Sequence, residues 1–578
     1  MAESKDLTKG NGSKIATREQ LLSERAELKA ALARAPNARA RLDLMISAPH
    51  AELIVPTLPA EEVYFTVKEL GMNDSLELIH LAGPDQFRSF VDLDAWRRDR
   101  IDVPTGLLWL RAAATDHDDE RFQKKLARLD IEVLELLLKT TMHIWDLTED
   151  PDPEPSGPTY PSPEGQYLVE FLVEGAEYIG AKRLLDQLYA EDPFKAARML
   201  EAIRWELPTE LEESAYRWRN ARLADLGFPD LAEALSFFAY VDPDAALPLL
   251  EKAPAVPEGF FLARIAPAER FFDRVVQRLD AEERGVLERQ LVTLLNAVMV
   301  AESVEPGELE QVERALREAR DTLSLGLEHA AQGDPSHAGA LLASAPLKRV
   351  FQVGVSLALK QKFRVDRLLR SGRAALPGSK DVPLFDPPVG EALVALRRRR
   401  PLYSEALDRP EEPSAPMRPA RDLEELAKLS DAVAEAERLA DLMEKLGFDA
   451  KTAEGSLAAA HPVESLAFLR FSDLYLSAAA RELAGESFAF APLPASRLAD
   501  FARRALQVEG GEATLTAEAL EALRAPLERE ASALSSEHRQ TADRFAALCV
   551  RRLTEEAGAP FAASGKLDPE LGLPLVVG

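Results

Sequence analysis

The 578-residue chain has a mass of 63.6 kDa, and 46% of its residues are apolar while 29% are charged. This balance is ordinary for a soluble globular protein of about three to five structural units, and it excludes a disordered or collagen-like chain. The formal charge of −28 argues against a protein that coats nucleic acid with its whole surface, and the single cysteine, Cys549, excludes both an intrachain disulfide and a zinc site with two thiolates.

The first element that the sequence predicts is a helix preceded by a polar, disordered tail of residues 1–14. Thr17 is placed to cap this helix, and Gln20, three residues later, completes a capping box. Leu21, Leu28 and Leu32 then mark an apolar stripe at helical spacing. The N-terminal region is therefore expected to begin with a well-capped amphipathic helix.

Proline at helix starts and glycine at helix ends recur along the rest of the chain. Pro59 precedes two acidic residues, as in many first helical turns, because proline lacks the amide hydrogen that has no partner there and the acids face the positive end of the helix dipole. Gly71, Gly227 and Gly447 each follow a leucine and precede an apolar residue, which is the pattern of a helix C-terminus. Because strand-like alternation is nearly absent, the sequence predicts a mainly α-helical protein, an irregular array of superhelical and bundle units with little or no β-sheet.

Two proline-rich segments divide the predicted array. Residues 150–163 contain six prolines and residues 401–419 contain five, and both are typical of stiff, exposed linkers. The predicted units are an N-terminal helical unit at 15–149, a middle unit at 164–400, a C-terminal unit at 420–563 and a tail at 564–578. The apolar end of that tail is expected to dock on the body of the protein.

No stretch of the chain is expected to cross a membrane. The most apolar run, from Leu291 to Ala301, is shorter than the about 20 residues of a spanning helix and contains Thr293 and Asn296. It is predicted to form a buried helix. Because the first residues lack the apolar core of a secretory signal and the single cysteine suits a reducing compartment, the expected location is the cytoplasm.

Residues 91–96 read Val-Asp-Leu-Asp-Ala-Trp, and residues 222–229 read Arg-Leu-Ala-Asp-Leu-Gly-Phe-Pro. With these phrases the chain resembles an uncharacterised family of large helical bacterial proteins, known only as a domain of unknown function. Through Leu58-Pro59-Ala60-Glu61-Glu62-Val63, Leu76-Glu77-Leu78-Ile79 and Gly83-Pro84-Asp85-Gln86-Phe87, the stretch from about residue 41 to 146 also looks like the intracellular superhelical N-domain of MgtE-type magnesium transporters. These resemblances imply a helical fold but no activity, and no metal-binding residue follows from them.

The densest group of potential metal ligands is the run Asp116-His117-Asp118-Asp119-Glu120. Histidine combined with carboxylates suits Mn, Fe or Zn, so the candidate ligands of a metal-dependent enzyme are Asp116, His117, Asp119 and, further along the chain, His143. Five consecutive polar residues between two helices are also typical of a solvated turn and an acidic helix start. The sequence favours the turn, and no cofactor is expected.

Residues 348–400 are basic within an acidic chain, with thirteen basic and four acidic side chains. The candidate partner-binding residues are Lys360, Arg364 and Arg367 on one helical face, and Arg397, Arg398, Arg399 and Arg400 at the end of the next helix. Three interpretations stay open: pairing with the protein's own acids, docking of an acidic protein partner, and contact with nucleic acid or anionic lipid. Internal pairing is favoured, and nucleic acid is the least expected because the surrounding charge repels it.

No catalytic residue is predicted. The run Gly354-Val355-Ser356-Leu357-Ala358 is similar to a nucleophile elbow, but a true elbow joins a strand to a helix, whereas this run lies within a predicted helix. The best prediction of function is a non-enzymatic cytoplasmic helical scaffold or adaptor that binds protein partners of unknown identity. The alternatives are a metal-dependent enzyme that uses residues 116–120 with His143, and a regulatory component associated with a membrane transporter or motor.

Overall fold

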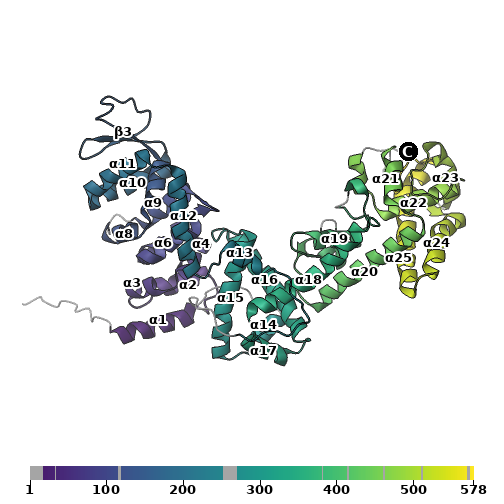
Figure 1. The fold of residues 1–578 in the computed structure, drawn as a ribbon, viewed down its shortest axis with the longest axis horizontal. Coiled ribbons are helices and arrows are strands. Elements are labelled where there is room, and N and C mark those ends of the chain that lie inside the picture. The colour runs from purple at the N-terminus through teal and green to yellow at the C-terminus, as the bar shows by residue number, and fades with distance from the viewer. Residues whose placement is uncertain are drawn as a thin grey trace, which may run out of the picture.

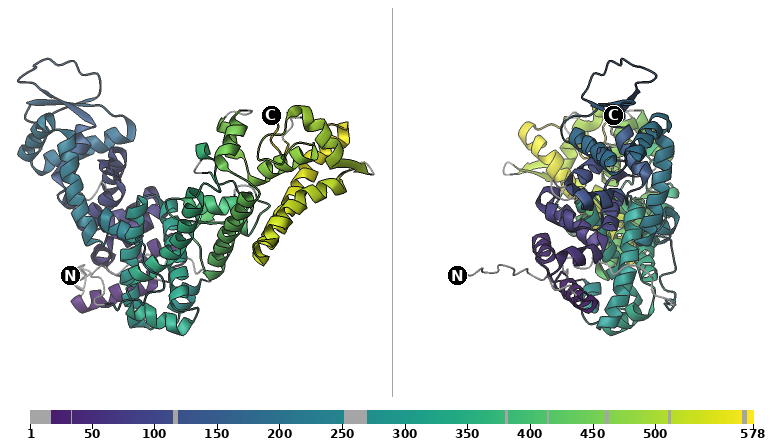
Figure 2. Two further views of the ribbon diagram at one scale, coloured as in Figure 1. Left: turned by 45° about the vertical axis from the view of Figure 1, so that its right-hand side comes forward. Right: turned by 90° about the vertical axis from the view of Figure 1, so that its left-hand side faces the viewer.

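The computed structural model describes residues 17–578 except 33, 115–118, 251–269, 380–381, 413–414, 460–462, 510–511 and 569–572. Successive helices build two arms that diverge from a middle section, with the N-terminal arm in purple and blue and the C-terminal arm in green and yellow (Figures 1 and 2). The predicted mainly α-helical fold is confirmed. Among the described residues, the strands form one three-stranded sheet and three two-stranded pairs, and an isolated bridge joins Leu493 to Val577. The predicted disordered tail, residues 1–14, lies outside the described residues.

The elements follow one another in chain order as shown in Figure 1. The helices of the N-terminal arm are α1 (Arg18–Leu32), α2 (Ala38–Ile46), α3 (Ala51–Ile54), α4 (Ala60–Leu70), α5 (Leu76–Leu81), α6 (Pro84–Asp94), α7 (Val103–Ala113), α8 (Asp119–Leu126), α9 (Ile131–Lys139), α10 (Gly175–Glu191), α11 (Pro193–Trp205) and α12 (Pro208–Asp225). The middle section contains α13 (Leu231–Ser236), α14 (Phe271–Val276), α15 (Ala281–Glu302), α16 (Leu309–Ala330), α17 (Pro335–Ser344) and α18 (Leu347–Arg370). The C-terminal arm contains α19 (Val389–Arg397), α20 (Leu423–Lys445), α21 (Ala450–Ala458), α22 (Phe471–Leu483), α23 (Leu498–Ala505), α24 (Ala517–Ser532), α25 (Ser536–Arg552) and α26 (Gly558–Ser564).

The strands are short and pair antiparallel. They are β1 (Trp96–Arg97), β2 (Arg100–Ile101), β3 (Met142–Asp146), β4 (Thr159–Pro161), β5 (Tyr167–Phe171), β6 (Tyr403–Ser404), β7 (Met417–Arg418), β8 (Leu506–Glu509) and β9 (Glu512–Leu515).

Helix ends form where the local sequence signals place them. The backbone N–H of Thr17 donates to Gln20 Oε1 at 3.0 Å, and the N–H of Gln20 donates back to Thr17 Oγ1 at 3.3 Å, which confirms the predicted capping box of α1. At the end of α12, Gly227 has a φ of +85°, which a residue without a Cβ adopts at little cost. The N–H of Phe228 then reaches back to the carbonyl of Leu223 at 2.9 Å, as in a Schellman motif.

The buried apolar side chains form two clusters that meet in the middle section. The first cluster runs from Leu28 to Phe351, and the second runs from Leu325 to Val576. On α18, Phe351 belongs to the first cluster while Val353, two residues later, belongs to the second. The pair α16 and α18 therefore joins the cores of the two arms.

These two helices cross with their backbones in contact. A Cβ added to Gly326 of α16 would lie 2.1 Å from the carbonyl oxygen of Val350, and one added to Gly354 of α18 would lie 2.1 Å from that of Thr322. Only glycine permits so close an approach. Gly354, the glycine of the elbow-like run, therefore lies within a helix as predicted, and it permits the close packing of α18 on α16.

The segment 150–163, predicted as an exposed linker, contributes β4 to the three-stranded sheet, whose order is β3-β5-β4. The backbone N–H and the hydroxyl of Ser156 donate to Glu170 Oε1 of β5 at 2.7 and 2.9 Å. Burial opposes the ionised form of Glu170, but these hydrogen bonds outweigh it and hold the pKa of this carboxyl at about 2. Prolines are tolerated here because β4 is an edge strand. The division of the chain into three units stays a prediction.

The second proline-rich segment, 401–419, is also tied to the body of the protein. It holds β6 and β7, and Arg418 of β7 pairs with Glu405 at 2.8 Å and with Glu425 at 2.7 Å. At the chain end, the N–H of Leu493 donates to the carbonyl of Val576 at 2.8 Å, and both side chains are buried. The apolar end of the tail docks as expected.

The two phrases that carried the first resemblance come together in space. Arg222 of α12 pairs through Nε with Asp92 at 2.7 Å and through Nη2 with Asp130 at 2.6 Å. Asp92 is buried, and burial raises the pKa of its carboxyl while the hydrogen bonds and charge of Arg222 lower it. On the same helix, Arg219 donates to the carbonyl oxygen of Asp92 at 2.7 Å. These contacts fix α12 against α6 across 130 residues of sequence.

The apolar run at residues 291–301 lies in α15, where Leu291, Leu294 and Val298 are buried, so the predicted buried helix is confirmed. None of the described helices combines the length and apolarity that a membrane-spanning segment needs.

One buried carboxyl on α9 predicts a pH dependence of stability. Burial, with smaller contributions from Glu206 and Glu132, raises the pKa of Glu135 to about 7. Because the folded state then holds this proton more tightly than the unfolded chain does, stability is greatest below the usual pKa of a glutamate and falls as the pH rises through about 7. Glu135→Gln is expected to raise stability by about 1–2 kcal/mol at pH 8 and to change it little at pH 4.

Thermal unfolding followed by circular dichroism at the two pH values measures this difference. The same change at Glu77, which is exposed on α5, serves as the control and is expected to have no pH-dependent effect. An equal effect of Glu135→Gln at both pH values would contradict the assignment.

Candidate functional site

The basic segment, residues 348–400, is partly neutralised by acids of the protein itself. Lys360 Nζ lies 2.8 Å from a carboxylate oxygen of Asp244, and Arg364 Nη2 lies 2.7 Å from one of Glu437. The hydrogen bond from Lys360 lowers the pKa of the Asp244 carboxyl. Of the three predicted partner-binding residues on α18, Lys360 and Arg364 therefore have an internal partner.

The end of α19 is also held in place. Arg397, its last residue, lies 3.6 Å from Asp366 of α18. Lys362 of α18 donates through Nζ to the carbonyl oxygen of Arg398 at 2.6 Å, which satisfies a backbone acceptor that the helix end leaves without a partner. These contacts set the direction in which the following arginines leave the helix.

Arg400 is fixed on three sides. Its Nη2 donates to the carbonyl oxygen of Ala301 at 2.9 Å, its Nη1 pairs with Glu302, and its guanidinium carbon lies 3.6 Å from the ring centroid of Phe238. Burial lowers the pKa of Arg400 to about 10, so the side chain is still a cation at neutral pH. It is a pre-positioned positive charge.

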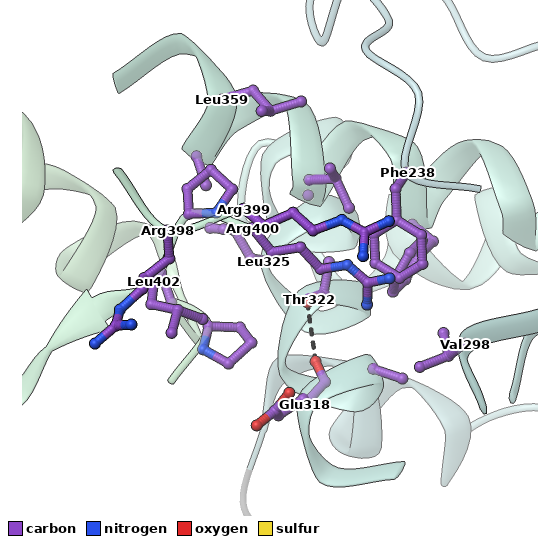
Figure 3. Close-up of a pocket in the computed structure, with 18 of the residues that line it drawn as sticks. Phe238, Val298, Glu318, Thr322, Leu325, Leu359, Arg398, Arg399, Arg400 and Leu402 are labelled. Atoms are coloured by element: carbon purple, nitrogen blue, oxygen red, sulfur yellow. Dashed lines mark hydrogen bonds between the residues drawn. The ribbon is translucent and has the colours of Figure 1, made fainter. Parts of the chain in front are cut away.

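Arg398 and Arg399 are exposed, and Figure 3 shows that they differ in direction. Arg399 and Arg400 both extend toward Phe238, whereas Arg398 points the opposite way. Within the described part of the chain, neither of these two side chains makes a hydrogen bond or an ion pair, and the same is true of exposed Arg367. Of the seven predicted partner-binding residues, these three are the ones left for an external contact, and that contact stays a prediction.

The arginines border a cavity of about 560 Å³, termed the arginine-lined cavity. Its walls come from α15, α16 and α18, from residues 398–402 and from residues 417–420. Most of the lining is apolar and includes Val298, Leu325, Phe351, Val355, Leu359 and Leu402. Segments about 180 residues apart in the sequence thus build one concave surface.

In the described part of the chain, the cavity wall contains two acidic residues, Glu302 of α15 and Glu318 of α16. Burial raises the pKa of Glu318, while the charges of Arg314 and Arg317 lower it. Figure 3 shows Glu318 one helical turn from Thr322, whose hydroxyl donates to the Glu318 carbonyl at 2.9 Å. The cavity therefore has a cationic border and a carboxyl at a distinct position along α16.

A second hollow, termed the tryptophan groove, lies in the N-terminal arm and has a volume of about 530 Å³. Trp145 of β3 and Trp205 of α11 line it, together with His143 and Leu172. Trp205 is 68% exposed, and the guanidinium of Arg204 lies 5.3 Å from its ring centroid. An exposed tryptophan beside a hollow is a feature of surfaces that bind other molecules.

The predicted metal ligands are not described together. Asp116 and His117 lie outside the described residues, Asp119 is the first residue of α8, and His143 is exposed on β3 with its ring 4.6 Å from that of Trp145. Among the residues that the structure describes, no group of three or more histidine, cysteine or acidic side chains could hold a metal ion. The metal site stays a prediction.

Sequence reasoning found the arginines of the cavity but not their neighbours. Phe238 lies in the turn after α13, Glu302 ends α15 and Glu318 lies in α16, and none of them carries a local signal of a shared site. The tryptophan groove was also missed, although Met142–Asp146 alternates in burial as a strand does and Trp205 stands at a helix end where a side chain is readily exposed.

Fold and sites together define a large, mainly helical protein with the arginine-lined cavity in its middle section and the tryptophan groove in its N-terminal arm. The chain belongs to the family of unknown function DUF6178, which matches residues 17–577. The resemblance to an uncharacterised helical family is thereby confirmed, whereas that to the magnesium-transporter N-domain is not. No curated protein and no solved structure matches the chain.

Proposed function

We propose that the protein is a non-enzymatic, cytoplasmic helical scaffold or adaptor that binds a protein partner through the tryptophan groove. The exposure of aromatic side chains on α11 carries this proposal. Phe194 is 84% exposed and Trp205 is 68% exposed. Because they are eleven residues, or about three helical turns, apart, both lie on one face of the helix.

Such side chains supply much of the free energy of a protein–protein contact. A phenylalanine or tryptophan buries about 150–250 Å² of surface, which contributes roughly 3–5 kcal/mol for each ring before the costs of association. Leu172, which lines the groove, and Leu207, two residues after Trp205, are both more than half exposed. The partner is expected to present an apolar surface to these residues.

The test compares two variants of the full chain. The double variant Phe194→Ser and Trp205→Ser removes the aromatic face, while Phe468→Ser removes a side chain that is 78% exposed in the C-terminal arm. Cross-linking in the native host followed by mass spectrometry is expected to capture the same partner with the wild type and with Phe468→Ser, and at least tenfold less of it with the double variant. Equal capture by the double variant, at an unchanged melting temperature, would contradict the proposal.

A further inference from the structure

The arginine-lined cavity combines an apolar interior with a cationic border. Its volume of about 560 Å³ lies within the range of about 300–1,000 Å³ that is usual for small-molecule sites. Val298, Leu325 and Phe351 are buried side chains of its wall. An occupant that removes water from these walls has to carry an apolar body of several carbon atoms.

The charge at the border is not balanced by the protein. Arg399 and Arg400 both extend toward Phe238 (Figure 3), and like charges that point the same way repel each other. Glu302 pairs with Arg400, whereas the Arg399 side chain has no hydrogen-bond or ion-pair partner in the described part of the chain. One positive charge is therefore left over where two guanidinium groups point the same way.

A carboxylate or phosphate group is the chemical complement of this arrangement. The planar guanidinium donates two parallel hydrogen bonds to either group, and such charge-assisted bonds are stronger than neutral ones. Arg400 is already held by Ala301, Glu302 and Phe238, so little side-chain freedom is lost when it binds. An anion between Arg399 and Arg400 would offset their repulsion.

Glu318 determines which way round such a molecule lies. A second anionic group beside this carboxyl would be repelled, and the raised pKa of Glu318 shows that its surroundings already disfavour charge. The anionic end therefore belongs at the arginines, and the part of the molecule near Glu318 is neutral. A molecule with one charged end and an apolar remainder satisfies both conditions.

We propose that the arginine-lined cavity binds a small amphipathic anion, whose single carboxylate or phosphate group is held by Arg399 and Arg400 and whose apolar body lies against α15, α16 and α18. This site is separate from the tryptophan groove, so it does not depend on the scaffold function. The fold places the site where the cores of both arms meet.

Isothermal titration calorimetry of the full chain tests the proposal with four probes used below their micelle-forming concentrations. Decanoate and decyl phosphate carry the two head groups, decylammonium carries the opposite charge, and inorganic phosphate lacks the apolar body. At least one of the two amphipathic anions is expected to bind at one molecule per chain, at least tenfold more tightly than decylammonium or inorganic phosphate. The tighter of the two identifies the head group.

Two exposed arginines provide matched variants. Arg399→Gln is expected to weaken binding of the tighter anion at least tenfold, while Arg367→Gln, which removes an exposed arginine of α18 outside the cavity lining, is expected to change it less than twofold. Both side chains are exposed, so neither change is expected to shift the melting temperature. The proposal is overturned if neither anion binds, if decylammonium or inorganic phosphate binds equally well, or if both variants retain wild-type affinity.

Discussion

Replacing Gly354 by alanine is expected to destabilise the protein by about 3 kcal/mol or more, because the new methyl group would lie 2.1 Å from the carbonyl oxygen of Thr322. Backbone atoms cannot rotate away as a flexible side chain can, so α16 and α18 have to separate. These helices carry side chains of both apolar clusters, among them Leu325 and Val353. The loss of packing is therefore expected to reach both arms, measured as a lower melting temperature in far-UV circular dichroism.

Gly339→Ala is the matched control, because Gly339 lies in α17 and no heavy atom stands within 4 Å of the position of its Cβ. Alanine is the better helix former by about 1 kcal/mol, so this variant is expected to be as stable as the wild type or slightly more so. Helix propensity alone predicts that both glycine-to-alanine changes raise the stability of the protein. If Gly354→Ala were as stable as Gly339→Ala, the close helix crossing would be wrong.

Replacing Arg222 by methionine is expected to destabilise the N-terminal arm by about 3–5 kcal/mol, because it leaves buried Asp92 and half-buried Asp130 without their common cation. All five tryptophans of the chain lie between residues 96 and 218. Tryptophan fluorescence during denaturant unfolding therefore reports on this arm. The midpoint of unfolding is expected to move to lower denaturant concentration.

The destabilisation caused by Arg222→Met is expected to decrease as the pH falls. Burial already raises the pKa of Asp92, and loss of Arg222 raises it further, so the folded variant binds a proton as the pH falls. The difference in stability between variant and wild type is expected to be largest at neutral pH and smaller toward pH 4. Arg217→Met on the same helix, whose partner Glu213 is as exposed as itself, is expected to change stability by at most about 0.5 kcal/mol. Equal effects of the two variants would contradict the role given to Arg222.

The predicted partner-binding residues show what a charge pattern in the sequence can and cannot predict about a site. The charge pattern drew attention to the tandem arginines, but it could not distinguish Arg398 from Arg399, which are adjacent and chemically identical. Their directions are decided by the irregular turn after α19, where Lys362 of α18 holds the carbonyl of Arg398. A contact between helices, and not the local pattern, therefore decides the direction of each arginine side chain at the cavity.

The proline-rich segments show where a local sequence pattern fits two different structures. Prolines in 150–163 indicate extended backbone, which is correct for β4, but extended backbone serves a linker and an edge strand equally well. The choice depends on β5, whose Val169 lies opposite Tyr160 of β4. A strand that pairs with a distant stretch shows only a weak alternation of apolar and polar residues in its own sequence. Strands of three to five residues are too short for that alternation to be recognised.

The sequence by itself determined the helical class, the family and the helix ends, because a cap such as Thr17 with Gln20, or a stop such as Gly227 with Phe228, acts within a few residues of backbone. Only the tertiary structure decided where α16 and α18 cross, which cation neutralises Asp92, and which arginines border a cavity. Those features join residues far apart in the chain, and their free energy arises from burial and charge that exist only once the helices have packed.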